Sequence, residues 1–112
     1  MISIVNQQIQ AELIEMMGED DWQELLLEAA TQFFERTKVL NDAIASEDWG
    51  SVRSMAHKIK GAMGSLGYDA VFNVLDVLEA QLLSQPPQMP SADDLQKIRN
   101  VLTETALALP AV

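Results

Sequence analysis

The sequence predicts an all-α fold: an up-and-down antiparallel four-helix bundle with an additional short N-terminal helix. Three observations predict it. Apolar residues recur at the helical spacing of three and four positions along most of the 112 residues, and no alternating strand pattern persists. Glycine, proline and capping residues divide the chain into five such segments. The last four segments are long and mostly joined by short connections, which favours antiparallel neighbours.

The shortest predicted helix opens the chain. It runs from about Asn6 to Met17, with Ile9, Leu13 and Met16 on one face, and Gly18 breaks it. Because it is shorter than the other helices, we expect it to lie across one end of the bundle.

The second predicted helix is the longest. It begins at Asp20 or Asp21, since Asp21 and Glu24 have the spacing of a capping-box variant, and it fades near Ser46. Its apolar stripe comprises Trp22, Leu25, Leu26, Ala29, Phe33, Leu40 and Ile44.

Three further helices complete the predicted bundle. The third runs from about Asp48 to Gly67, the fourth starts at Asp69, and the fifth runs from Ser91 to Pro110, with Asp94 three residues after its start. The proline-rich connector SQPPQMPS ends the fourth helix. We find no internal repeat and no second domain, and therefore expect a single domain over residues 1–112.

Composition and charge argue against several classes of function. A formal net charge of −10 repels the phosphates of nucleic acids and anionic membrane surfaces. The absence of cysteine rules out a disulfide framework and a thiolate metal site. The N-terminus lacks a signal-peptide pattern, and no stretch approaches the roughly 18 apolar residues of a membrane span. We expect a cytoplasmic, monomeric protein whose partner is another protein.

The third predicted helix carries the only histidine of the chain, His57. On a helical wheel it falls almost opposite Ile59 in the core stripe, so it faces solvent. The same outer face carries Gly50, Arg53, Lys60, Gly61 and Gly64. Each glycine within a helix costs about 0.5–1 kcal/mol relative to alanine, so three on one face need a reason. We expect these glycines to leave bare backbone around the imidazole, where a large partner can approach.

Two cations flank the imidazole on its own helix. Arg53 lies four residues before His57 and Lys60 lies three residues after it, an arrangement that suits an imidazole meeting an anion. Near neutral pH an imidazole has a nucleophilic neutral fraction. No carboxylate lies within one helical turn of His57 in the sequence, so we expect no acyl-transfer triad.

The stretch Ala56-His57-Lys58-Ile59-Lys60-Gly61, followed by Leu66-Gly67, resembles the signature of histidine phosphotransfer (HPt) domains, as attached to bacterial hybrid sensor kinases. The resemblance implies a phosphorelay protein that accepts a phosphoryl group on Nε2 of His57 from a phospho-aspartate of a receiver domain and passes it to another receiver. It also implies that Lys60 is the accompanying cation and Gly61 the clearance glycine. Arg53, Gly50 and Gly64 are added from the helical wheel.

The resemblance also bears on cofactors and partners. It implies response-regulator receiver domains and a hybrid sensor kinase as partners, with Mg²⁺ held by the receiver. The chain lacks the glycine-rich loops that bind nucleotides, so we expect a phosphocarrier without its own ATP site. We expect no metal site either, because the acidic run of residues 19–21 is better explained as a helix cap.

Two other functions stay open at this point. The first is the histidine-phosphorylation segment of a sensor kinase, although Gly61 and Ala62 stand where that family has a hydroxyl residue and a proline. The second is a helical adaptor that binds a partner without phosphorylation. Self-phosphorylation from ATP would indicate the first, and failure to take label from a phosphorylated receiver would indicate the second.

Overall fold

The computed structural model describes residues 3–110, so the two residues at each end of the predicted domain 1–112 lie outside it. Among the described residues, all regular secondary structure is helical and no strand is present, so the predicted all-α class is confirmed. The helices are α1 (Gln7–Met17), α2 (Glu19–Ala45), α3 (Trp49–Gly64), α4 (Asp69–Leu83) and α5 (Ala92–Ala108).

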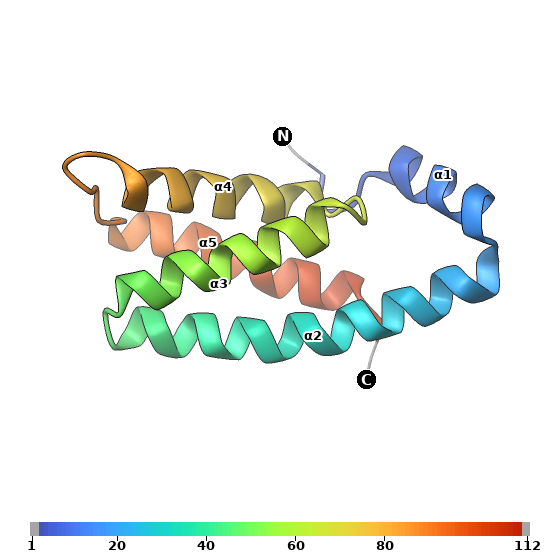
Figure 1. Ribbon diagram of the computed structural model, residues 1–112, viewed down its shortest axis with the longest axis horizontal. Helices are drawn as coiled ribbons and strands as arrows, with labels where there is room; N and C mark the ends of the chain where they lie inside the picture. The colour runs from blue at the N-terminus through green and yellow to red at the C-terminus, as the bar shows by residue number, and fades with distance from the viewer. Residues whose placement is uncertain (1–2, 111–112) are drawn as a thin grey trace.

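The four long helices lie side by side (Figure 1). In chain order α2, α3, α4 and α5 alternate in direction along the 45 Å length of the molecule. Helix α3 packs between α2 and α4, while α5 contacts both α4 and α2, so the four helices surround one core. The closest helix pair is α3 with α4, and this pair carries the candidate site.

The core follows the predicted apolar stripes. From α3 it receives Val52, Ala56, Ile59 and Met63, as the helical wheel predicts. Its largest fully buried apolar side chains are Tyr68, Phe33, Leu40, Ile59, Met63, Leu75 and Leu78. Burying a side chain of this size contributes about 1.5–3 kcal/mol, so these residues fix the side of α3 that faces inward. The opposite side of α3 is thereby held in solvent.

Side-chain caps begin α1, α3 and α5, whereas α2 and α4 have none. The Asp48 carboxylate accepts the backbone N–H of Ser51 at the start of α3, and Ser91 forms a reciprocal capping box with Asp94. The capping box predicted for Asp21 in α2 is wrong, because α2 begins earlier and Gly18 is its N-cap. Its acidic first turn instead lies beside the positive end of the helix dipole.

Helix α1 is tied to the turn between α3 and α4. The backbone N–H of Asn6 donates to the carbonyl of Gly67 over 2.6 Å, and its side chain donates to Asp69 over 3.0 Å. Gly67 adopts a φ of +87°, which favours glycine. The predicted inward position of Met16 is wrong, because its side chain is 81% exposed and the neighbouring Met17 is the half-buried one.

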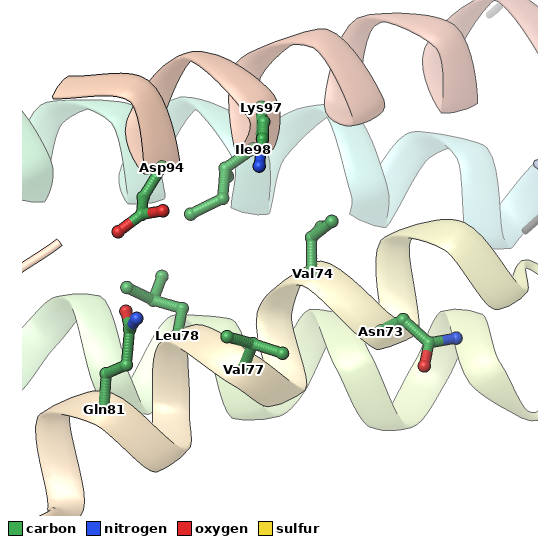
Figure 2. A pocket seen from close by; sticks show the side chains of 8 residues that line it. All are labelled: Asn73, Val74, Val77, Leu78, Gln81, Asp94, Lys97 and Ile98. Carbon is green, nitrogen blue, oxygen red and sulfur yellow. The ribbon is translucent and has the colours of Figure 1, made fainter. Parts of the chain in front are cut away.

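A groove of about 350 Å³ runs between α4 and α5 (Figure 2). Its apolar lining residues are Val74, Val77, Leu78 and Ile98, and its polar ones are Asn73, Gln81, Asp94 and Lys97. On α4, Val77 lies two residues from Glu79, so the groove and the α3-facing carboxylate occupy different sides of that helix. In the described part of the chain, no helix is both long and apolar enough to cross a membrane.

Candidate functional site

The imidazole of His57 stands on the solvent side of α3. Its side chain is 69% exposed, while the adjacent Ala56 and the nearby Ile59 are almost completely buried. The exposure follows from the helical period, because fixing the apolar stripe inward places residue 57 outward. A partner can therefore reach this ring without any rearrangement of the core.

A carboxylate from the neighbouring helix holds one nitrogen of the ring. Nδ1 of His57 lies 3.0 Å from Oε1 of Glu79 and 3.3 Å from Oε2, and the Glu79 side chain is only 15% exposed. An ionised carboxylate only accepts hydrogen bonds, so the proton resides on Nδ1. Nε2 then carries the free lone pair, and among the described residues it has no hydrogen-bond partner.

This contact adds a carboxylate from outside the single helical turn that the sequence analysis considered around His57. Glu79 lies 22 residues further along the chain, and the packing of α3 against α4 brings it to the ring. One signal in the sequence could have indicated it, because Glu79 interrupts an apolar helix between Leu78 and Leu82. A charged residue beside a buried stripe usually has a partner on the adjacent helix.

Lys60 joins the same network. Its Nζ lies 2.9 Å from Oε2 of Glu79 and 3.1 Å from Oδ1 of Asp76, and 5.7 Å from the centre of the Phe72 ring. The hydrogen bonds to Glu79 and then Asp76 raise the pKa of Lys60. Lys60, and to a smaller extent His57, lower the pKa of Glu79 against the opposing effect of burial. The ammonium predicted to face a phosphoryl group is thus already paired with two carboxylates.

The three glycines of this face have different surroundings. An added Cβ would meet nothing within 4 Å at Gly61 and only the Asp48 carboxylate, at 3.9 Å, at Gly50. At Gly64 it would lie 2.6 Å from the ring of Phe72 in α4. The expectation that Gly64 clears space for a partner is therefore wrong, because this glycine lets Phe72 of α4 pack closely against α3.

Arg53 brings a further positive charge close to the imidazole. It lines a hollow of about 350 Å³ at the imidazole, together with Ser54, Lys58, Glu79 and Leu83. Within residues 3–110 its guanidinium forms no ion pair. Arg53 can thus face an anion arriving at His57, whereas the positive charge of Lys60 is already shared between two carboxylates.

The arrangement is suited to a nitrogen nucleophile. Within residues 3–110, no group of three or more histidine or acidic side chains is placed to hold a metal. What the site offers is an exposed Nε2, a carboxylate on the opposite nitrogen and a nearby guanidinium. These groups can align a small tetrahedral anion and take a bond at Nε2.

Comparison with known proteins identifies the family of the chain. The Hpt domain model matches residues 6–108. The chain belongs to the Hpt domain family. Hpt domains act in histidine phosphotransfer within phosphorelays, where they carry phosphoryl groups between kinases and receiver domains. The predicted role in histidine phosphotransfer is confirmed at this level.

The fold of this Hpt domain is also found in a solved structure. It is similar to histidine-containing phosphotransfer protein B (HptB) from Pseudomonas aeruginosa PAO1, with a TM-score of 0.75 and 20% sequence identity. The match covers 96% of this chain and 92% of that chain, and at this identity it shows a shared fold. No curated protein matches this Hpt domain.

Proposed function

We propose that this Hpt domain accepts a phosphoryl group on Nε2 of His57 from a phospho-aspartate of one receiver domain and passes it to another. A single observation carries the proposal. His57 is the only histidine of the chain, and its Nε2 is open to solvent while its Nδ1 is held by Glu79. A histidine phosphotransfer domain with one histidine has one place to hold the group.

The transfer itself exchanges one bond for another. The lone pair of Nε2 attacks phosphorus, a P–N bond forms, and the P–O bond to the aspartate carboxylate breaks. The aspartate leaves as a carboxylate, and no proton has to move because Nδ1 already holds one. The ring becomes a phosphoimidazolium, whose positive charge lies beside the Glu79 carboxylate. The same steps in reverse deliver the group to the second receiver.

Each neighbouring side chain has a defined part in this proposal. Glu79 is a positioning residue, because it keeps Nδ1 protonated and Nε2 directed outward. Arg53 is placed to screen the phosphoryl oxygens. Lys60 contributes charge to the same region, and it also holds the Glu79 carboxylate in position over 2.9 Å. Gly61 and Gly50 leave the surface open to the receiver.

Further parts of the proposal concern the whole protein. The proposed fold is an up-and-down four-helix bundle of α2 to α5 with the short α1 at one end. The contacts between the helices support it. Phosphoryl groups enter only from partners, a hybrid sensor kinase and response regulators, because we propose that the protein has no ATP site. Mg²⁺ is expected on the receiver. A cytoplasmic monomer stays a prediction.

The test is a transfer assay with one substitution. A receiver domain phosphorylated on its aspartate with labelled phosphate is mixed with the protein, and acid-labile, base-stable label on the protein is measured. The unchanged protein takes up label, and His57→Gln takes up none. Lys97→Gln in α5 controls for a surface substitution elsewhere and retains uptake. Label on His57→Gln would contradict the proposal, as would a wild-type protein that accepts label from no receiver of its source organism.

A further inference from the structure

The hollow at the imidazole continues into a second one toward the end of the bundle. This second hollow, of about 230 Å³, is lined by Trp49, Gly50, Arg53, Leu82, Pro87 and Met89. Arg53 lines both hollows, so they adjoin across its side chain. Gly50 lies two helical turns, about 10 Å, before His57 on the same side of α3. The connector between α4 and α5 closes this end (Figure 1).

Exposed apolar side chains border these two hollows. Leu83 at the end of α4 and Met89 in the connector are each 52% exposed, and Pro87 is exposed beside them. We define the connector face by its lining side chains Arg53, Leu83, Pro87 and Met89. An apolar surface with a charged rim, adjoining a reactive group, is the composition expected of a protein-binding site.

Charge distinguishes this face from the rest of the molecule. Three of the seven lysines and arginines lie in α3, and none of the 17 acidic residues does. Of these three cations, Arg53 and Lys58 make no ion pair within residues 3–110. Arg53 and Lys58 therefore give α3 uncompensated positive charge beside this face, on a chain whose formal net charge is −10. Such charge attracts a partner whose contact surface is acidic.

We infer that a receiver domain docks on the connector face while its phospho-aspartate meets Nε2 of His57. The inference rests on the proposed function, which makes an acidic phosphorylation site the partner of this imidazole. To the proposed function the inference adds where the receiver lies: from His57 it covers Arg53 and extends toward Leu83 and Met89. The receiver surface that fits this face has apolar side chains next to its acidic site.

Geometry favours this face over the other apolar surfaces. A transient interface covers several hundred square ångströms of each partner. The hollow that Leu83 lines beside His57, and the adjoining hollow that Gly50 lines two helical turns before it, fall within such an area. The groove between α4 and α5 lies around the other side of α4, and Leu107 lies at the opposite end of α5 from the connector. Neither adjoins the imidazole.

The experiment separates docking from chemistry. The protein is phosphorylated on histidine in two ways: by phosphoramidate, a small donor that needs no docking surface, and by a limiting amount of a phosphorylated receiver. For each variant the receiver-dependent rate is divided by the phosphoramidate rate. The variants are Leu83→Asp and Met89→Asp, and the matched control is Leu107→Asp, whose leucine is 82% exposed and remote from the imidazole.

We expect the ratio to fall about fivefold or more for Leu83→Asp and Met89→Asp, as for interface residues that contribute measurably to binding, and to stay unchanged for Leu107→Asp. Circular dichroism of the helical signal checks that each variant folds. Where an aspartate unfolds the protein, Leu83→Ala and Met89→Ala replace it, and we expect smaller decreases of the same rate ratio. Unchanged ratios for both connector-face variants, or an equal loss in Leu107→Asp, would overturn the docking inference alone. A wild-type protein that is phosphorylated by phosphoramidate and by no receiver would overturn the proposed function.

Discussion

At the scale of single residues, the hydrogen bond between His57 and Glu79 decides which ring nitrogen can react. It occupies Nδ1 at 3.0 Å and leaves Nε2 exposed. Glu79 in turn is held by Lys60, whose ammonium lies 2.9 Å away. The site is therefore a chain of contacts in which a surface imidazole receives its orientation from a nearly buried ion pair.

The first prediction concerns Glu79. Replacing it by alanine removes a hydrogen bond to a charged group, worth about 1.5 kcal/mol or more, which corresponds to about a tenfold slower transfer from the receiver. Glu79→Gln loses less, because its amide oxygen still accepts a hydrogen bond from the Nδ1–H of His57. Single-turnover transfer kinetics at saturating receiver measure both. Asp76→Ala is the control, since Asp76 contacts Lys60 and not His57. Glu79→Ala with the wild-type rate would remove the positioning role.

The exposure of His57 could be predicted from the sequence, and its partner could not. Helical periodicity places a residue on the inner or outer side of its own helix, and this requires only local information. The contact with Glu79 depends on how α3 and α4 are rotated and shifted against each other, which is a property of packed side chains. For the same reason, the pairing of Lys60 with two carboxylates was missed.

At the scale of the helices, one glycine of α3 lets α4 pack closely against it, while another glycine of α3 leaves the surface uncovered. Gly64 admits the Phe72 ring, which would lie 2.6 Å from an added Cβ, whereas an added Cβ at Gly61 meets nothing within 4 Å. The sequence assigned both glycines the same role because they share a helical face. Only the position of α4 distinguishes them.

This difference gives the second prediction. Gly61→Ala raises the free energy of unfolding by about 0.5–1 kcal/mol, because alanine favours the helix and nothing obstructs it. Gly64→Ala gains less than Gly61→Ala or loses stability, because Phe72 has to move. Urea unfolding followed by circular dichroism measures both. Equal gains for the two variants would show that Phe72 does not pack against Gly64.

A third prediction follows from the pKa of Glu79. Its contacts with Lys60 and His57 lower this pKa below the ordinary value of 4.5. Between the lowered pKa of Glu79 in the folded protein and its ordinary value, the unfolded chain binds more protons than the folded one. The contacts of ionised Glu79 therefore stabilise the fold fully above about pH 4.5, and this stabilisation is lost as the pH falls through the folded-state pKa. Between about pH 6 and pH 3, Glu79→Gln should lose less stability than the wild type in urea unfolding. Parallel losses would show that this ion pair does not stabilise the α3–α4 contact.

At the scale of the whole molecule, helix number and most helix boundaries could be predicted from periodicity, prolines and caps. Ser91 with Asp94 begins α5 as expected, because a capping box is a local pattern. The start of α2 differs, since Gly18 takes the cap position that Asp21 was expected to hold. The outward Met16 also follows from tertiary structure: the orientation of α1 is set by the bonds of Asn6 to the α3–α4 turn.

The fourth prediction concerns the oligomeric state. Helices α2 to α5 close one core within a single chain, and the large exposed apolar side chains are distributed over several helices, as in a monomer. Sedimentation equilibrium at micromolar concentrations should therefore give the mass of one chain, 12.4 kDa. A mass of two chains would show that one of these surfaces is covered by a second copy.

The most direct test of the central claim identifies the nitrogen that carries phosphorus. The protein, with isotope-labelled histidine, is phosphorylated and studied by NMR, which detects nitrogen–phosphorus coupling and the proton on each ring nitrogen. The geometry at Glu79 predicts phosphorus on Nε2 of His57 and a retained proton on Nδ1. Phosphorus on Nδ1, or a stable phosphoryl group on any other residue, would contradict the account.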